Sequence, residues 1–260
     1  MSGFRISWRF LRVWQRNFIV YQKIWKINFL PPLLEPLLYI AAFGVGLGVL
    51  VGQIDYEGAR LSYVEFIAPG LLAVAMMQNA FFETTYTSFV RMYYQKTFDA
   101  IMATPLSLEE VIAAEIVWGA TKALFATVAM QAVLSVLGLI HYPYALLVLP
   151  VAFLGGVAFG AVGMLFTGVT PTIDVFNLPI FLFITPMFLF SGTFFPLTQL
   201  PEWAQKMAYI FPLTHLVKVT RSLCLGSPGL EICWNLAYLI VFSGIFFPLA
   251  LWAMRRRLVR

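Results

Sequence analysis

A long central part of this chain carries no charged side chain. Residues 123–173 contain no Asp, Glu, Lys or Arg, and a His-Tyr-Pro-Tyr turn at 141–144 divides them. The hydrocarbon core of a bilayer is about 30 Å thick, and about 20 apolar helical residues cross it. The stretch is therefore long enough to hold parts of two spans. A water-soluble fold is excluded, because a 260-residue chain that is 61% hydrophobic and 11% charged cannot bury its apolar surface in one core.

The apolar runs along the chain predict an all-α polytopic membrane protein with six transmembrane helices. We place the spans near residues 28–51, 66–90, 111–139, 145–168, 175–196 and 233–254. Together they form a permease domain over residues 28–254, and a basic tail follows at 255–260.

Residues 1–27 predict an amphipathic helix that lies on the membrane surface rather than crossing it. Five basic residues share one helical face, and an aromatic stripe lies on another. The basic residues are Arg5, Arg9, Arg12, Arg16 and Lys23, and the stripe is Phe4, Leu11, Phe18 and Trp25. We expect the aromatic side to face lipid and the basic side to face anionic headgroups. Contact with a cytoplasmic partner is left open.

The distribution of lysine and arginine predicts that both termini are cytoplasmic. With the N-terminus inside, twelve basic residues are cytoplasmic and four are external, while Lys122 is intramembrane. The cytoplasmic set is Arg5, Arg9, Arg12, Arg16, Lys23, Lys26, Arg91, Lys96, Arg255, Arg256, Arg257 and Arg260, and the external set is Arg60, Lys206, Lys218 and Arg221. The loop at 91–110 is then cytoplasmic.

The chain lacks the residue patterns of an enzyme. It has two histidines, His141 and His215, and no H-x-x-x-H, C-x-x-C, G-x-S-x-G or phosphate-binding G-x-x-x-x-G-K-[ST] pattern. We therefore expect no catalytic residue, no metal site and no cofactor bound by this chain. We expect membrane lipids as binding partners of the chain, and we expect no nucleic acid partner.

Four charged residues fall in the cytoplasmic halves of the predicted spans, namely Glu35, Glu83, Glu115 and Lys122. An intramembrane charge costs about 2.5–3.5 kcal/mol on insertion, so such groups usually face a cavity or a partner. They either reach out to the interface or line an inward vestibule for a substrate headgroup, with Glu35 and Glu83 as the candidates. A proton relay is a third option, and with it a proton-coupled secondary transporter.

Prolines and phenylalanines mark the fifth span and the segment after it. Pro179 and Pro186 should kink the span. Phe181, Phe188 and Phe195 form a stripe that faces lipid or core, or else forms a wall for acyl chains or stacked sugars. Residues 197–224 are amphipathic and broken at Pro212, which predicts an external re-entrant hairpin of two short helices.

Cys224 and Cys233 flank a Gly-Ser-Pro-Gly turn. Two alternatives are open for them. The turn could bring the two residues within disulfide distance, or each thiol could be buried separately as a small apolar group.

The order of these features resembles the type-2 ABC export permeases. A "TPLS" loop follows span two, and "FSGTFFPLTQLPEW" and "FPLTHLVKVTRSL" follow span five. Within that family the chain resembles the NodJ-like nodulation-factor (lipo-oligosaccharide) permeases and their polysaccharide- and drug-export relatives. The resemblance implies a coupling helix between spans two and three that docks on a separate ATP-binding subunit. The candidate residues are Gln95, Lys96, Thr97, Phe98, Asp99, Ile101, Met102, Thr104 and Pro105.

The residues of this loop fit that role. Phe98, Ile101 and Met102 lie at i, i+3 and i+4, which would give an apolar anchor for a groove. Ser107 and Glu110 have the spacing of a capping box and predict the start of span three.

The resemblance also implies a function. The chain would be the membrane-spanning subunit of an ATP-driven exporter in a bacterial plasma (inner) membrane. A homodimer would pair with two ATP-binding subunits, which hold ATP and Mg. Its substrate would be amphiphilic, either a lipid-linked saccharide, a lipo-oligosaccharide or a hydrophobic drug-like molecule, moved out of the cytoplasm or the inner leaflet.

Overall fold

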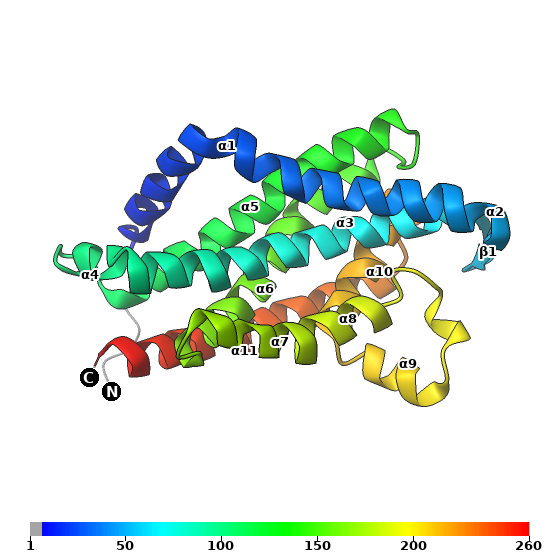
Figure 1. Cartoon of the computed structure of the whole chain (residues 1–260). Helices are drawn as coiled ribbons and strands as arrows, with labels where there is room; N and C mark the ends of the chain where they lie inside the picture. The colour runs from blue at the N-terminus through cyan, green and yellow to red at the C-terminus, as the bar shows by residue number, and fades with distance from the viewer. Residues whose placement is uncertain (1–6, 260) are drawn as a thin grey trace.

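The computed structural model describes residues 7–259, and the side chains of all of these except 27–29, 31–33, 36 and 45. Long helices run side by side along the molecule (Figure 1). The beginning of α1 (Phe10–Ala41), the short α4 (Thr97–Met102) and the end of α11 (Glu231–Leu258) lie together at what we call the terminal end. The strands β1 (Gln53–Tyr56) and β2 (Ala59–Ser62) lie at the opposite end, with α9 (Glu202–Ala208), and we call this the hairpin end.

Five helical segments of the described chain are long and apolar enough to cross a membrane, which agrees with the predicted all-α polytopic class. They cover Tyr63–Tyr94, Leu108–Val136, Tyr144–Val169, Ile173–Phe190 and Glu231–Leu258. The first comprises α3 (Tyr63–Phe82) and the π-helical turns η2 (Glu83–Thr87) and η3 (Val90–Tyr94), and the second is α5 (Leu108–Val136). The third comprises η4 (Tyr144–Leu147) and α6 (Val148–Val169). The fourth is made of η5 (Ile173–Phe176), α7 (Asn177–Pro179), the π-helical η6 (Ile180–Ile184) and α8 (Thr185–Phe190).

The predicted first span, 28–51, is helical but is not among these five. It belongs to α1, which continues through η1 (Ala42–Leu47) and α2 (Gly48–Val51). The predicted surface helix belongs to α1 as well, because the two segments are joined by a kink at Ile24, where φ is −126° and ψ is 16°. Figure 1 shows α1 as one bent helix whose second arm runs beside α3.

The first arm of α1 differs from the prediction in what its aromatic side faces. Trp14, Phe18 and Tyr21 pack on Trp118 of α5, with ring centroids 5.6–6.5 Å apart, and Phe18 and Tyr21 also contact Phe125. The expectation that these rings face lipid is therefore wrong for this part of the arm. Arg5 and Phe4 lie outside the described residues.

The β-hairpin between α2 and α3 was not predicted. Asp55 pairs with Arg60 and Tyr56 with Ala59 in its antiparallel register. Glu57 and Gly58 form the turn, both with positive φ, as in the tight turns that suit two-residue hairpins. Ser62 then caps α3 through a capping box with Glu65.

The predicted hairpin segment contains η7 (Leu197–Gln199), α9 and α10 (Pro212–Cys224). The break falls at Pro212, which occupies the first turn of α10, where a missing N–H costs little. Nearly all of α10 is buried against α3, α6 and α11. Arg221, counted above among external basic residues, is only 2% exposed.

Small residues allow α5 and α6 to pack closely. A Cβ atom built on Gly156 of α6 would lie 2.6 Å from the Cα of Ala120 on α5, and one on Gly163 would lie 2.2 Å from Oγ1 of Thr84. Gly160, four residues after Gly156, meets Ile116 of α5 at ordinary contact distance. Close helix approach of this kind is typical of membrane bundles, where apolar burial alone gives little association energy.

Replacing Gly156 with Ala should destabilise the protein by about 1–3 kcal/mol, because the new methyl group would overlap backbone of α5. Gly244→Ala on α11 is the matched control, since a Cβ there meets nothing within 4 Å and alanine favours the helix. Thermal unfolding midpoints in one detergent compare the two variants. Equal midpoints would contradict the close contact.

The two cysteines are not bonded to each other. Cys224 is buried at the end of α10, and Cys233 is exposed on α11. The disulfide alternative is therefore wrong, and burial raises the pKa of the Cys224 thiol to about 12.

Cys233 should react with an uncharged maleimide within minutes at pH 7.5, whereas Cys224 should react only after denaturation, because its thiolate is scarce and covered. Intact-mass analysis without reductant counts the added groups. One adduct in the native protein and two in the denatured protein are expected, and no adduct in either state would restore the disulfide.

Candidate functional site

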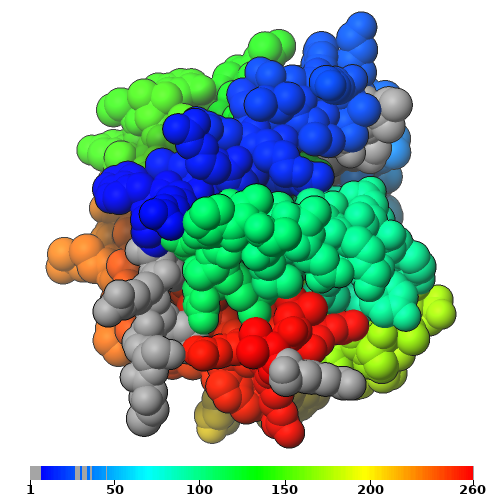
Figure 2. Space-filling view, turned by 90° about the vertical axis from the view of Figure 1, so that its left-hand side faces the viewer, coloured from blue at the N-terminus to red at the C-terminus, as the bar shows by residue number. Residues whose placement is uncertain are grey.

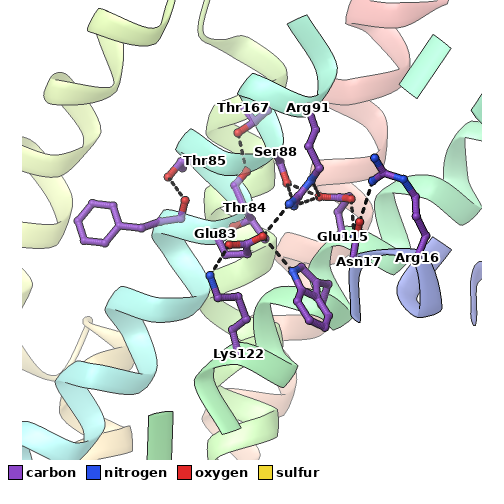
Figure 3. A network of polar contacts seen from close by, with 12 residues as sticks. Arg16, Asn17, Glu83, Thr84, Thr85, Ser88, Arg91, Glu115, Lys122 and Thr167 are labelled. Carbon is purple, nitrogen blue, oxygen red and sulfur yellow. Dashed lines mark hydrogen bonds and ion pairs between the residues drawn. The ribbon is translucent and has the colours of Figure 1, made fainter. Parts of the chain in front are cut away.

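Four charged side chains from two neighbouring helices meet inside the molecule, towards its terminal end (Figure 3). They are Glu83 and Arg91 of the first membrane-length segment and Glu115 and Lys122 of α5, and we call them the charge cluster. Arg91 pairs with both carboxylates, and Lys122 pairs with Glu83. Two positive and two negative charges are thus balanced within one contact network.

Glu83 accepts from three donors. Nη1 of Arg91 lies 2.9 Å from its Oε1 and Nζ of Lys122 lies 2.8 Å from its Oε2. The indole Nε1 of Trp118 donates to Oε1 at 3.0 Å. Its side chain is only 2% exposed, so these contacts supply the hydrogen bonds that a buried carboxylate needs.

The carboxylate of Glu115 also accepts hydrogen bonds from three residues. Nδ2 of Asn17, on the first arm of α1, donates to Oε1 at 2.9 Å, and the hydroxyl of Ser88 donates to Oε2 at 2.5 Å. Nε of Arg91 donates to Oε2 at 3.1 Å, and Nη2 of Arg91 contacts the same oxygen. The cluster therefore joins α1, α5 and the π-helical end of the α3 segment.

This arrangement answers the question that the intramembrane charges raised. Glu83 and Glu115 are buried and do not stand alone, because Arg91 pairs with both of them and Lys122, whose side chain is 17% exposed, pairs with Glu83. Arg91 was counted as a loop residue, but its side chain is 11% exposed and lies inside the bundle. Breaking such a buried group of charges is costly, because the remaining partner keeps its charge without compensation.

The helix that carries Glu83 and Arg91 is irregular around both residues. Glu83–Thr87 and Val90–Tyr94 are π-helical, a form that often marks functional sites. The backbone carbonyl of Thr84 accepts a 2.7 Å hydrogen bond from the hydroxyl of Thr167 on α6. This contact adds α6 to the elements that the region connects (Figure 3).

A cavity of about 190 Å³ lies beside the charge cluster, between the first arm of α1 and the two helices that bear the charges. Arg16, Tyr21, Gln95 and Lys122 are on its wall, and so is Glu83. Glu35 is not on this wall. Its Oε1 instead accepts a 3.4 Å hydrogen bond from Nε2 of Gln78 on the outer surface of the chain. The structure therefore does not bring Glu35 and Glu83 into one vestibule.

The predicted coupling helix is present as α4, and the predicted capping box follows it. The Ser107 side chain accepts from the Glu110 backbone N–H at 3.2 Å, and the Glu110 carboxylate accepts from the Ser107 N–H at 2.8 Å. Lys96 precedes α4 with a φ of 53°, which turns the chain sharply out of η3.

Phe98 does not point outward as the predicted anchor requires. It is fully buried within this chain, in a cluster with Phe89, Met92 and Ile112, and Ile101 and Met102 are half-buried against the same cluster. The apolar face of α4 thus packs onto its own bundle. The exposed residues of the loop are Gln95, Lys96, Asp99, Ala100, Ala103, Thr104 and Pro105, and Thr97 is half-buried.

Contacts at the terminal end hold this loop against both ends of the described chain. Nη1 of Arg9 donates to the carbonyl of Pro105 at 3.0 Å, and Arg255 of α11 pairs with Glu109 at 3.7 Å. Figure 2 shows the start of α1 in blue, the loop in green and the end of α11 in red sharing one face. The contacts of Arg9 and Arg255 therefore hold the loop in place, with its exposed residues on the surface of the terminal end.

The predicted aromatic stripe of the fourth membrane-length segment is divided between environments. Phe181 is 69% exposed, and Phe195 is half-buried. Phe188 packs at 6.1 Å from Tyr39 and 5.1 Å from Phe194, and Phe43 joins this group from η1. The second arm of α1 and α8 therefore meet through aromatic rings near the hairpin end.

Sequence patterns missed three polar residues that matter here. Arg91 was assigned to the cytoplasmic loop and Arg221 to the external hairpin, and Asn17 was not considered. A basic residue eight positions after an intramembrane glutamate, as Arg91 is after Glu83, was the available signal. Among residues 7–259, no group of three His, Cys, Asp or Glu side chains is placed to hold a metal ion.

Arg91→Gln should lower the unfolding free energy by about 3–5 kcal/mol, because Glu83 and Glu115 would stay buried without their shared cation. Arg60→Gln is the control, since its 3.6 Å pair with Asp55 is exposed and contributes about 1 kcal/mol or less. Adding Glu115→Gln to the Arg91 variant should recover part of the loss. Thermal melts in detergent measure all three, and similar effects of Arg91→Gln and Arg60→Gln would contradict the role of the cluster.

Comparison with known proteins identifies the family to which the sequence is similar. Residues 9–225 match the family model described as ABC-2 type transporter. The chain is 37% identical over 260 residues to Nodulation protein J of Rhizobium leguminosarum bv. trifolii, covering 100% of this chain and 97% of that protein. It is 35% identical over 252 residues to Nodulation protein J of Sinorhizobium fredii, covering 97% and 95% of the two chains.

A more distant relative is the Inner membrane transport permease YadH of Escherichia coli, 25% identical over 249 residues, which are 94% of this chain and 93% of that protein. The family match covers most of the chain, and identities above 30% extend over nearly its full length. This chain, with its membrane-length helices and buried charge cluster, therefore belongs to the ABC-2 type transporter family.

Proposed function

We propose that this chain is the membrane-spanning subunit of an ATP-driven exporter, acting as a homodimer with two ATP-binding subunits. Its family implies a partner ATP-binding subunit. The observation that carries the proposal is the position of the charge cluster directly behind α4. Arg91 lies six residues before α4. It binds Glu83 of its own helical segment and Glu115 of α5.

The exposed residues of the 95–105 loop form the docking surface for the partner. Lys96 and Asp99 are exposed there and supply charge for contacts at its rim. Phe98 anchors α4 to the bundle rather than to the partner, so a push on α4 is passed to the core through its apolar side. Arg91 then passes the displacement to α5 and, through Glu115 and Asn17, to α1.

The terminal end is the cytoplasmic end in this proposal. The lysine and arginine bias of the sequence supports that orientation. It places α4 where an ATP-binding subunit can reach it, and the β-hairpin and α9 on the external side of a bacterial inner membrane.

The substrate is amphiphilic, and a lipo-oligosaccharide or another lipid-linked saccharide fits best. Support comes from the resemblance to lipo-oligosaccharide permeases and from the surface along the second arm of α1, where it meets α3 and α8. There Glu35 and Gln78 supply a polar pair, and the rings of Tyr39, Phe43 and Phe188 lie nearer the hairpin end. In a homodimer such a surface borders a path with polar and aromatic parts.

A proton-coupled secondary transporter is the alternative. Such a protein needs carboxylates that gain and lose protons along a route through the membrane. Glu83 and Glu115 are instead held together in one cluster, with Arg91 paired to both and Lys122 paired to Glu83, rather than spaced along such a route. This arrangement supports ATP-driven transport over the alternative.

Co-expression with its ATP-binding subunit should give a stable complex with ATPase activity, because this chain lacks a phosphate-binding loop. Affinity purification through a tag on this chain, followed by phosphate-release assays, tests this. Nucleotide hydrolysis by the isolated chain at the rate of the complex would contradict the proposal.

Two variants of α4 should fail in different ways. Asp99→Lys alters only the exposed surface, so it should reduce yield of the complex several-fold while leaving the melting temperature unchanged. Phe98→Ala opens a cavity in the chain's own core and should cost about 3–5 kcal/mol of stability. Pull-down yield and thermal melts of both variants are the measurements. A stable Phe98→Ala protein that loses only its partner would restore the anchor role of Phe98.

A further inference from the structure

A second cavity, of about 140 Å³, lies between the β-hairpin, the loop after α8, Tyr209 and α10. Figure 1 shows the β-hairpin and the loop after α8 at the hairpin end. Six polar or aromatic residues of its wall come from three separate parts of the chain: Asp55, Tyr56, Glu57, Tyr209, Lys218 and Arg221. The charge cluster and the coupling loop have no residue here.

Arg221 is the most unusual member of this wall. It is buried to 2% exposure, yet it forms no ion pair with any carboxylate of residues 7–259. Its Nε donates to the carbonyl of Phe66 at 3.1 Å, and its Nη2 donates to the carbonyl of Gly192 at 2.9 Å. Two aromatic rings cover its faces, Phe66 at 3.9 Å and Tyr56 at 5.2 Å from the guanidinium carbon. A fixed cation of this kind, at the wall of a cavity, is a preformed donor for a ligand.

The opposite charges on the wall restrict what the ligand can be. Asp55 and Glu57 supply two carboxylates, and Arg221 and Lys218 supply two cations, so the wall has no net charge. An anionic ligand would be attracted by Arg221 and Lys218 but repelled by Asp55 and Glu57. A cationic ligand would be attracted by the two carboxylates and repelled by the two cations. A hydroxyl group both donates and accepts, so it suits a site with both kinds of partner.

We infer that this cavity binds one uncharged pyranose ring of a saccharide. Its volume is below the roughly 300–1,000 Å³ of sites that enclose drug-sized molecules, which favours a single small unit. Tyr209 is 45% exposed and supplies aromatic surface for the apolar side of a sugar, while Nζ of Lys218 donates to its hydroxyl at 2.9 Å and lies 4.6 Å from the centre of its ring. The inference rests on the proposed export of a saccharide-bearing substrate, and it adds a sugar subsite within each chain at the hairpin end.

Saturation-transfer NMR on the full chain in nanodiscs with its ATP-binding subunit, without nucleotide, tests this site. The probes are the methyl glycoside of N-acetylglucosamine, methyl glucoside, glucuronate and inorganic phosphate. At least one neutral glycoside should receive saturation and compete with the other for the same site. Binding of phosphate or glucuronate alone would show an anion site and overturn the inference, as would the absence of any binding.

Variants show whether the binding occurs in this cavity. Asp55→Asn combined with Glu57→Gln should weaken glycoside binding about tenfold, because charge-assisted acceptors are lost from an exposed turn that stays intact. Arg221→Lys is a second variant for the opposite wall and should weaken binding similarly. Glu231→Gln, exposed at the start of α11 and outside the cavity, is the control. Unchanged affinity in the first two variants would overturn the assignment, even if ATP-dependent transport persists. Glycoside binding by an unaltered complex that shows no ATP-dependent transport would instead count against the proposed exporter function while leaving the sugar subsite in place.

Discussion

The two-sided pairing of Arg91 is the interaction on which the rest of the bundle depends. One guanidinium joins a carboxylate of its own helix to a carboxylate of α5, and Asn17 extends the contact to α1. Because the side chains of Glu83 and Glu115 are almost completely buried, each carboxylate requires the donors that it has. The positions of α1, α3 and α5 at this depth are therefore tied to one another, and α4 follows directly on the same chain segment.

The hairpin end is held by a different kind of contact. Arg221 there donates to backbone carbonyls of α3 and of the loop after α8, and no carboxylate of the described residues pairs with it. Thr220, beside it on α10, donates to the carbonyl of Pro69 at 3.1 Å. One end of the bundle is thus fixed by matched charges, and the other by side chains that bind the main chain of distant segments.

The sequence was most informative where a pattern is local. The apolar runs predicted most of the membrane-length helices, and Ser107 with Glu110 predicted the start of α5. Pro212 predicted the break before α10. The errors concern what a residue faces. Periodicity separates the apolar side of α4 from its polar side, but it does not tell whether Phe98 packs on its own bundle or on a partner. Arg91 and Arg221 border apolar runs, so their burial depends on neighbours that are far away in the sequence. The β-hairpin was not predicted because its strands are only four residues long. Its turn is Glu-Gly, which is a weaker sequence signal for a hairpin than Asn-Gly.

The distribution of the charge cluster between two helices has a consequence for biogenesis. The α3 segment carries one glutamate and one arginine in the cluster, and α5 carries one glutamate and one lysine. Each helix therefore enters the bilayer with its own two cluster charges balanced, within two turns or slightly more of one another, which lowers the cost of insertion before any partner helix is present. The cross-helix pairs of Arg91 with Glu115 and of Lys122 with Glu83 form only when both helices are in place. Membrane insertion and helix association can thus proceed as separate stages, with the formation of these cross-helix ion pairs marking the passage from the first to the second.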